Sequence, residues 1–100
     1  MEVIISQQGG KTLADIKGRI DTTSADQFQK DIAPLMETEN PDIEIGCADM
    51  EYTSSQGLRI FLMLQKSVSA KGGKLVLKSM RPQVKEVFDI TGFSNIIKII

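Results

Sequence analysis

Apolar residues recur along this chain at two spacings, every second position in some stretches and every third or fourth position in others. Val3–Ser6 and Thr12–Ile16 are short runs on either side of Gly9-Gly10, and two such runs joined by glycines are typical of a β-hairpin. Ile43–Ala48 is predicted to be a strand with Ile43, Ile45 and Cys47 on one face, and Lys74–Lys78 and Ile96–Ile100 are two further predicted strands.

Three other stretches carry apolar residues at the spacing of an amphipathic helix. The first begins after the cap candidates Asp21–Ser24, and we expect Pro34 to kink or tighten its last turn, because proline leaves the carbonyl of Lys30 unpaired. The second runs from about Gln56 to Ser69 and ends at Gly72-Gly73; the third begins near Pro82 and ends at Gly92. The side chains expected to face the core are Ala25, Phe28, Ile32, Leu35 and Met36, then Leu58, Phe61, Leu62, Leu64 and Val68, then Val84, Val87 and Phe88.

The order of these elements is strand, strand, helix, strand, helix, strand, helix, strand. After the opening hairpin, the alternation of strands and helices is typical of right-handed crossovers between parallel strands. The sequence therefore predicts an α/β fold with a small, mostly parallel sheet, an N-terminal hairpin strand and three to four helices. We expect a single domain over residues 1–100, because no linker or repeat interrupts the pattern.

Composition narrows the function classes. The chain is 41% apolar with a net charge of −1 and no dense basic run, so we expect no binding to nucleic acid, which depends on clustered Lys and Arg. No apolar stretch approaches the roughly 20 residues of a membrane helix, and no secretory signal is recognisable. We therefore expect a cytoplasmic protein without membrane insertion. The lone cysteine, Cys47, is predicted to be a buried thiol, and no cluster of residues suggests a metal site.

Asp49–Leu58 is the segment most informative about function, because small hydroxyl residues stand directly before a helical pattern there. A serine at a helix start can be a cap, a nucleophile or a phosphorylation switch. The chain has no histidine, which excludes Ser-His-Asp and Cys-His mechanisms within it. Only a Ser–Lys hydrolase survives as a catalytic alternative, and no lysine stands at a diagnostic spacing. We therefore expect neither an enzyme nor a cofactor.

Several motifs, taken in order, resemble those of the STAS family, specifically its small single-domain anti-sigma factor antagonists of bacteria. The family has an aspartate at the end of its second strand and a Ser-x-Gly-Leu element at the junction of third strand and second helix. It then has a glycine pair before a strand, a Pro-x-Val helix and an apolar-Asp-x-x-Gly-apolar element. The matching segments here are Gly18–Asp21, Asp49–Leu58, Gly72–Leu75, Pro82–Val84 and Phe88–Phe93.

The resemblance implies a role in partner switching. In that family the serine two residues before the Gly-Leu pair accepts phosphate, and Ser55 occupies that position. The unmodified protein would bind a GHKL-type serine kinase that doubles as an anti-sigma factor. That kinase would phosphorylate Ser55 with its own ATP, and a PP2C-type phosphatase would reverse the change.

Two positions depart from the family pattern. Ser54 stands where the sporulation members often have aspartate, and Gln56 stands where a small residue is usual. Gln56 favours the alternative function, a phosphorylation-independent STAS scaffold or a transporter-associated regulatory domain. A helix cap and a phosphorylation switch are compatible roles for the two serines, since Ser54 can cap the helix while Ser55 is exposed.

We expect the partner-binding surface to surround Ser55. Arg59 lies one helical turn further along and can pair with a phosphate there, while Asp21 would oppose it if the two strand ends are neighbours. Tyr52 is expected to be a half-buried packing residue. The predicted partner-binding residues are Asp21, Thr22, Thr23, Ser54, Gln56, Gly57, Arg59 and Met63.

Overall fold

A computed structural model describes all residues, 1–100, and contains one five-stranded sheet with three α-helices. The strands are β1 (Glu2–Gln8), β2 (Lys11–Ile20), β3 (Asp42–Thr53), β4 (Lys74–Lys78) and β5 (Lys98–Ile99). The helices are α1 (Ala25–Met36), α2 (Ser55–Ala70) and α3 (Pro82–Ile90), followed by a short 3-10 turn, η1 (Phe93–Asn95).

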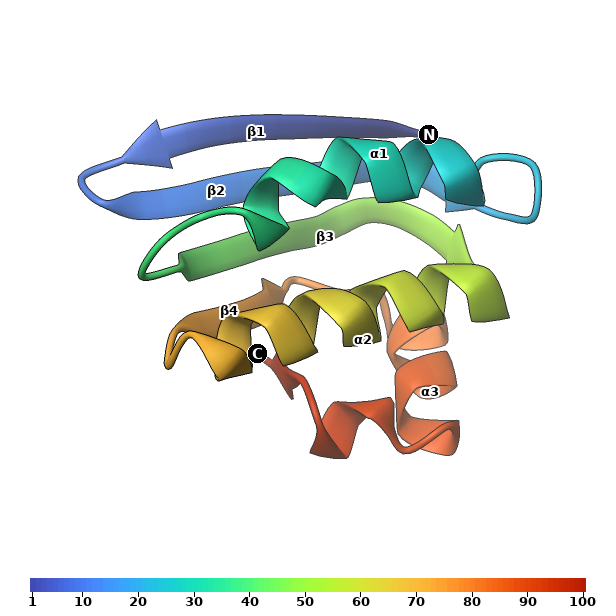
Figure 1. Cartoon of the computed structure of the whole chain (residues 1–100). Helices are drawn as coiled ribbons and strands as arrows, with labels where there is room; N and C mark the ends of the chain where they lie inside the picture. Colours follow the sequence, from blue (N-terminus) through green and yellow to red (C-terminus); the bar gives the residue numbers. More distant parts are fainter.

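The strands lie in the order β1-β2-β3-β4-β5, which is also their order along the chain (Figure 1). β1 and β2 form the predicted antiparallel hairpin, and every later neighbour is parallel. The sequence-based prediction of a mostly parallel α/β sheet with an N-terminal hairpin is thus confirmed.

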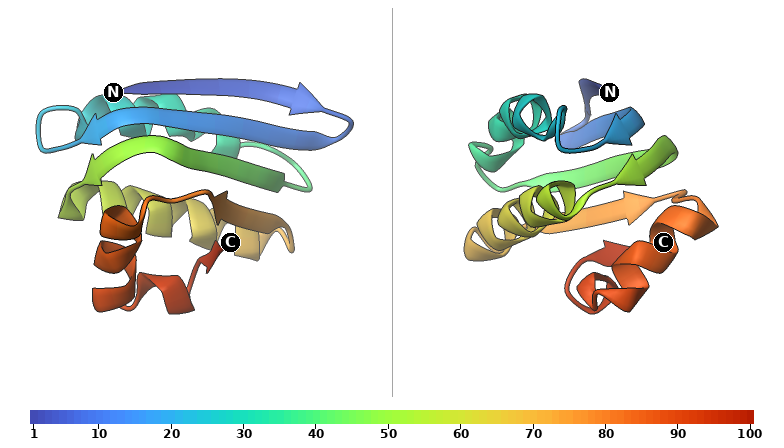
Figure 2. Two further views of the ribbon diagram at one scale, coloured as in Figure 1. Left: turned by 180° about the vertical axis from the view of Figure 1, so that it is seen from behind. Right: turned by 90° about the vertical axis from the view of Figure 1, so that its right-hand side faces the viewer.

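The helices cover the sheet unevenly. α1 and α2 lie side by side on one face, whereas α3 lies on the other side, beside the second half of β3 (Figure 2). The Nε–H of Arg81 donates to the carbonyl of Ala48 at 2.9 Å, which ties the start of α3 to β3. None of the helices is long and apolar enough to cross a bilayer.

The core is mainly aliphatic, as expected from the composition, with a row of three phenylalanines at its centre. Phe28, Phe61 and Phe88 come from the three helices, and successive ring centroids are 5.2 and 5.6 Å apart. The predicted inward positions are largely correct. Two assignments in α2 differ, because Ile60 is buried although it was not placed inward, and Leu62 is only partly buried.

The central strands are longer than predicted and the last is shorter. β2 continues to Ile20 and β3 to Thr53, because the two strands stay paired through register shifts after Asp15 and after Gly18. Such irregularities break the two-residue alternation that reveals a strand in sequence. At the other end, η1 lies directly before the predicted strand Ile96–Ile100, and only Lys98–Ile99 of that stretch pair with β4.

Helix ends follow the predicted signals. α1 continues past Pro34 to Met36, and the backbone N–H of Glu37 then donates to the carbonyl of Pro34, a three-residue step that tightens the last turn as expected. α2 ends at Ala70, and Gly72 follows with a φ of +67°, which suits glycine, while the N–H of Gly73 donates to the carbonyl of Val68.

Candidate functional site

The N-terminus of α2 is capped by Ser54. Its Oγ accepts a hydrogen bond from the backbone N–H of Gly57 at 3.3 Å, and its carbonyl accepts the N–H of Leu58 at 3.0 Å. Its own N–H donates to the carbonyl of Ile20 at 2.7 Å. Ser54 is 7% exposed, so its hydroxyl is committed to the fold.

Ser55 is the first residue of α2, and its side chain is exposed. The first N–H groups of a helix have no partner within the helix, and Ser54 satisfies only that of Gly57. The N–H groups of Ser55 and Gln56 therefore have no intrahelical acceptor, beside an exposed hydroxyl. This division between a capping Ser54 and an exposed Ser55 confirms the structural expectation from the sequence.

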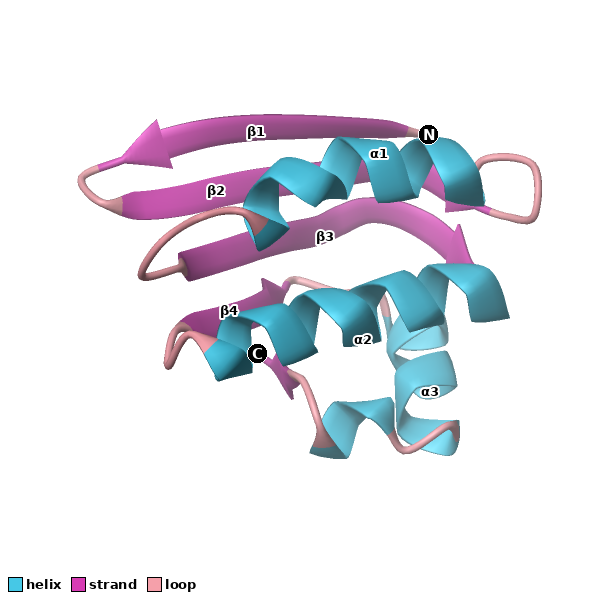
Figure 3. Ribbon diagram, viewed as in Figure 1, coloured by secondary structure: helices cyan, strands magenta, loops and turns pink.

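The hydrogen bond between Ser54 and Ile20 joins the end of β3 to the end of β2, where Asp21 follows directly. Figure 3 shows the loop before α1 and the start of α2 at the same end of the sheet. Gly57 permits this approach: a Cβ there would overlap Thr53 Oγ1 and lie 2.9 Å from Ile20 Cγ2. The two segments predicted to form the site are thus held together by the backbone.

Asp21 organises the loop that leads into α1. Its Oδ1 accepts hydrogen bonds from the Thr23 hydroxyl at 2.7 Å and from the N–H groups of Thr23 and Ser24 at 3.0 Å. These donors, the Thr23 hydroxyl foremost, hold the pKa of the Asp21 carboxyl below its usual value despite an opposing effect of desolvation. Asp21 is therefore a stable negative charge at this end of the sheet.

A shallow hollow of ≈ 140 Å³ lies between the first turns of α1 and α2. Arg59 and Asp26 both line it, yet Arg59 takes part in none of the three ion pairs of the molecule. Its full lining is Ala25, Asp26, Gln29, Gln56, Arg59, Ile60 and Met63. The hollow brings together Gln56, Arg59 and Met63 from the predicted set, and adds α1 residues that the sequence did not indicate.

The predicted site residues divide into two groups. Thr22, Thr23, Gln56, Arg59 and Met63 are exposed, and Asp21 is partly exposed. By contrast, Ser54 and Gly57 are buried and have little surface to offer a partner. Their contribution is to position the exposed residues around them.

One pair of side chains close to this end of the sheet was not predicted from the sequence. The guanidinium of Arg19 lies 4.6 Å from the centre of the Tyr52 ring, a cation–π arrangement between paired positions of β2 and β3. Tyr52 is 39% exposed, so it is a surface residue and more open than the half-buried packing role expected for it. The pair could not be found from the sequence, because it depends on the shifted register that places Arg19 opposite Tyr52.

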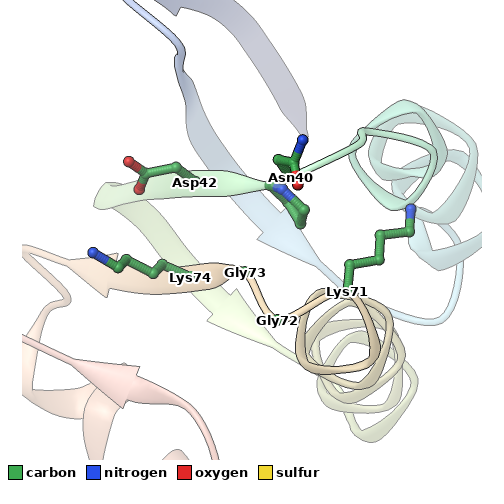
Figure 4. A pocket seen from close by; sticks show the side chains of 7 residues that line it. Asn40, Asp42, Lys71, Gly72, Gly73 and Lys74 are labelled. Atoms are coloured by element: carbon green, nitrogen blue, oxygen red, sulfur yellow. The ribbon is translucent and has the colours of Figure 1, made fainter.

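A second hollow, of ≈ 210 Å³, lies at the opposite end of the sheet (Figure 4). Lys71 points from it toward the end of α1, where its Nζ donates to the carbonyls of Thr38, at 3.0 Å, and Met36. Lys74 and Asp42 point the other way. The lysine thus caps a helix, and the hollow lies away from the carboxyl ends of the strands, where ligands of open α/β sheets usually bind.

The exposed side chains at the start of α2 are the hydroxyl of Ser55 and the amide of Gln56. No group of three or more His, Cys, Asp or Glu residues has the geometry to hold a metal ion. Cys47 is buried in β3, as predicted, and burial raises the pKa of its thiol to about 12. The arrangement is that of an exposed hydroxyl at the N-terminus of a helix.

Comparison with known proteins identifies the fold family. Residues 2–100 match the family model described as the STAS domain. The anti-sigma-B factor antagonist of Bacillus subtilis is 33% identical over 99 residues, covering 99% of this chain and 90% of that protein. BtrV of Bordetella bronchiseptica is 29% identical over 96 residues, covering 96% and 83% of the two chains. The chain therefore belongs to the STAS-domain family.

Solved structures agree with that assignment. The anti-sigma factor antagonist SpoIIAA in its unphosphorylated form superposes with a TM-score of 0.80 at 16% identity, covering 99% of this chain and 88% of the other. The phosphorylated form of SpoIIAA from Bacillus gives a TM-score of 0.73 at 15% identity, with coverages of 99% and 91%. At these identities the likeness establishes the shared fold.

Proposed function

We propose that this chain is an anti-sigma factor antagonist, a binding module that is switched off by phosphorylation of Ser55. The observation that carries the proposal is the exposed Ser55 hydroxyl at the start of α2, beside the Asp21 loop, with Ser54 already used as the cap. Relatives that bear the name of anti-sigma factor antagonist support the class of partner. SpoIIAA, which shares the fold, has been observed with and without phosphate.

The electrostatics of the site favour a surface switch. A phosphate adds about −1.5 to −2 charges and is favoured at a helix N-terminus, where free N–H groups and the helix dipole attract an anion. Arg59 is one turn along α2 and has no ion-pair partner, so it is available to the phosphate. Asp21 stays ionised nearby, so modification converts a mixed surface into a strongly anionic one.

The proposed partner is a GHKL-type serine kinase that also acts as the anti-sigma factor, with a PP2C-type phosphatase restoring the free hydroxyl. The kinase would contact the exposed residues Thr22, Thr23, Gln56, Arg59 and Met63 around Ser55. A bulky anion at the centre of such an interface would be desolvated, and the single positive charge of Arg59 would balance only part of the about −1.5 to −2 charges of the phosphate. A loss of about 4 kcal/mol would weaken binding roughly a thousandfold.

Two measurements test the proposal, one of phosphorylation at Ser55 and one of binding to the kinase. The chain is incubated with the GHKL-type kinases of its own cell and ATP, and phosphate is located by mass spectrometry. We expect modification of wild type and of the Ser69→Ala control, an exposed serine on the same helix, but not of Ser55→Ala. Binding to the kinase, measured by calorimetry, should fall at least about tenfold for Ser55→Asp. No phosphate on Ser55, together with unchanged binding by Ser55→Asp, would contradict the switch.

A second candidate function is a phosphorylation-independent STAS scaffold or a transporter-associated regulatory domain. The exposed amide of Gln56 favours it, because that side chain lines the hollow next to Ser55 and adds bulk where a kinase would approach. Gln56→Ala and Ser55→Asp together separate the two candidate functions. Faster phosphorylation of Gln56→Ala than of wild type would identify Gln56 as a brake on the switch, whereas partner binding that is indifferent to Ser55→Asp would favour the scaffold.

A further inference from the structure

The outer edge of β1 is unpaired and unprotected. All seven residues of β1 pair with β2 on one side, and no helix or strand lies beyond β1 in the plane of the sheet (Figures 1 and 2). Soluble proteins normally protect such an edge with proline, lysine, a bulge or a covering element, because its free N–H and C=O groups can pair with another strand. β1 has none of these, since its register is unbroken and Glu2 is its only charged residue.

The opposite edge of the sheet, formed by β5, is less open to pairing with another strand. β5 is two residues long and one of them is Lys98, so it offers little backbone to a new strand. β1 also carries exposed apolar side chains: Ile4 is 43% and Ile5 39% exposed. The open edge and its apolar side chains coincide, which makes β1 the place where this fold can add a strand.

We propose that β1 pairs antiparallel with β1 of a second copy of this chain, in a twofold-symmetric dimer with one continuous sheet. Two identical β1 edges can pair in this arrangement, since a twofold axis perpendicular to the sheet places the free N–H and C=O groups of one β1 opposite the same groups of the second β1. Such an axis keeps the two faces of the sheet separate. Side chains can therefore oppose only side chains of the same face.

That constraint selects a register centred on Ile4. Val3 and Ile5 share the helix-covered face with their β2 partners Ile16 and Ala14, whereas Ile4 lies on the other face. With Ile4 on the axis, Ile4 meets Ile4 of the second copy and Val3 meets Ile5. Glu2 then meets Ser6, so no like charges face each other. Centring on Ile5 would place Val3 opposite Gln7 and Ile4 opposite Ser6, which loses those apolar contacts.

The dimer would be weak and independent of the proposed switch. A few strand pairs bury far less than the roughly 1,600 Å² of a standard interface, so we expect a dissociation constant on the order of 0.1–1 mM. Asp21 and Ser55 lie at one end of the sheet, and the twofold axis carries the second pair to the opposite end. Substitution of Ser55 should therefore leave dimerisation unchanged, which separates this inference from the proposed function.

Sedimentation velocity from about 10 μM to about 1 mM, a range that brackets that constant, tests the pairing. Ile4→Lys brings two ammonium groups together at the axis. Ile90→Lys is the matched control, because Ile90 is 76% exposed on α3, away from β1. We expect wild type and Ile90→Lys to associate with rising concentration and Ile4→Lys to bind itself at least about tenfold more weakly. A wild type that stays monomeric throughout, or equal association by the two variants, would overturn the proposal.

Cysteine cross-linking tests the register without relying on a charged substitution. Opposed side chains of antiparallel strands have Cβ atoms about 4.5–5.5 Å apart, close enough for a disulfide after a small adjustment. Cys47 does not interfere, since it is buried and its thiol pKa is raised to about 12. Under mild oxidation Ile4→Cys should form covalent dimers faster than Ser6→Cys, an exposed position on the same face. Equal rates, or faster cross-linking of Ser6→Cys, would refute the Ile4-centred pairing.

Discussion

The backbone N–H of Ser54 donates to the carbonyl of Ile20 at 2.7 Å, and this one bond joins the two segments that carry the candidate switch. Ser54 begins α2 and Ile20 ends β2, so the bond fixes Ser55 relative to Asp21 through the backbone. The candidate site therefore lies at the carboxyl ends of the central strands, where the proposed phosphorylation of Ser55 would change the surface that a partner contacts.

Gly57 is expected to be essential for this arrangement of the two segments. A Cβ at this position would overlap Thr53 Oγ1 and lie 2.9 Å from Ile20 Cγ2, so Gly57→Ala must push α2 away from β2. We expect a loss of about 1–3 kcal/mol in the free energy of unfolding by urea, although alanine alone would favour the helix by up to about 1 kcal/mol. The exposed neighbour Gln56→Ala serves as control and should stay within about 0.5 kcal/mol of wild type. A neutral Gly57→Ala would contradict the close approach.

The two adjacent serines should separate in a stability measurement. Ser54→Ala removes the acceptor for the Gly57 N–H and is expected to cost about 1 kcal/mol. Ser55→Ala removes an exposed hydroxyl outside the cap, so it should change stability by less than about 0.5 kcal/mol. Thermal unfolding followed by circular dichroism measures both. Equal effects would mean that the capping role is shared between the two hydroxyls.

The order of elements could be predicted because the apolar spacing is regular where helices and strands are regular. Phe28, Ile32 and Leu35 follow a helical period and are all buried. The second halves of β2 and β3 escaped prediction because register shifts after Asp15 and Gly18 interrupt the alternation. The pairing itself, which no single segment encodes, defines those strands.

The candidate site was predictable only in part, for a similar reason. Capping chemistry at the start of α2 is local, so the division between Ser54 and Ser55 could be inferred from neighbouring residues. The hollow between α1 and α2 is not local, because it requires Asp26 and Gln29 to lie beside Arg59. Packing of two helices on one sheet face creates that surface, and no spacing within either helix indicates it.

A negative charge at Ser55 should stabilise the fold while it weakens partner binding. Ser55 is the first residue of α2, where the helix dipole favours an anion by about 0.3–1 kcal/mol. Ser55→Asp is therefore expected to raise the free energy of unfolding by about that amount at low salt. Ser69→Asp places the same charge in the last turn of the same helix and should be destabilising. Urea titrations of both variants measure the contrast, and a destabilised Ser55→Asp would argue against a surface switch.

Cys47 should be inert in the folded protein. Its side chain is fully buried and burial raises its thiol pKa to about 12, so the reactive thiolate is scarce at neutral pH. We expect the aromatic disulfide reagent DTNB to leave the native chain unmodified over minutes at pH 7–8. One thiol per chain should react after denaturation in urea, which provides the internal control. Rapid reaction without denaturant would show that β3 opens readily.

Acid titration should reveal the Asp21 loop. The Thr23 hydroxyl, foremost among the donors to Asp21, lowers the pKa of that carboxyl in the folded state. Because the folded pKa is depressed, this stabilisation is present at pH values above the unfolded pKa of about 3.9 and is lost as pH falls through the folded value. Thr23→Val removes the hydroxyl but keeps the backbone N–H that also donates to Asp21.

The Asp21 carboxyl of Thr23→Val should titrate closer to its usual value than that of wild type, as followed by NMR of the side-chain carbon. Thr22→Val is the matched control, since Thr22 is exposed and donates no hydrogen bond to Asp21. If both variants titrate like wild type, the loop in solution is held by its backbone alone. A shift confined to Thr23→Val would instead establish the hydroxyl as the group that keeps Asp21 charged beside Ser55.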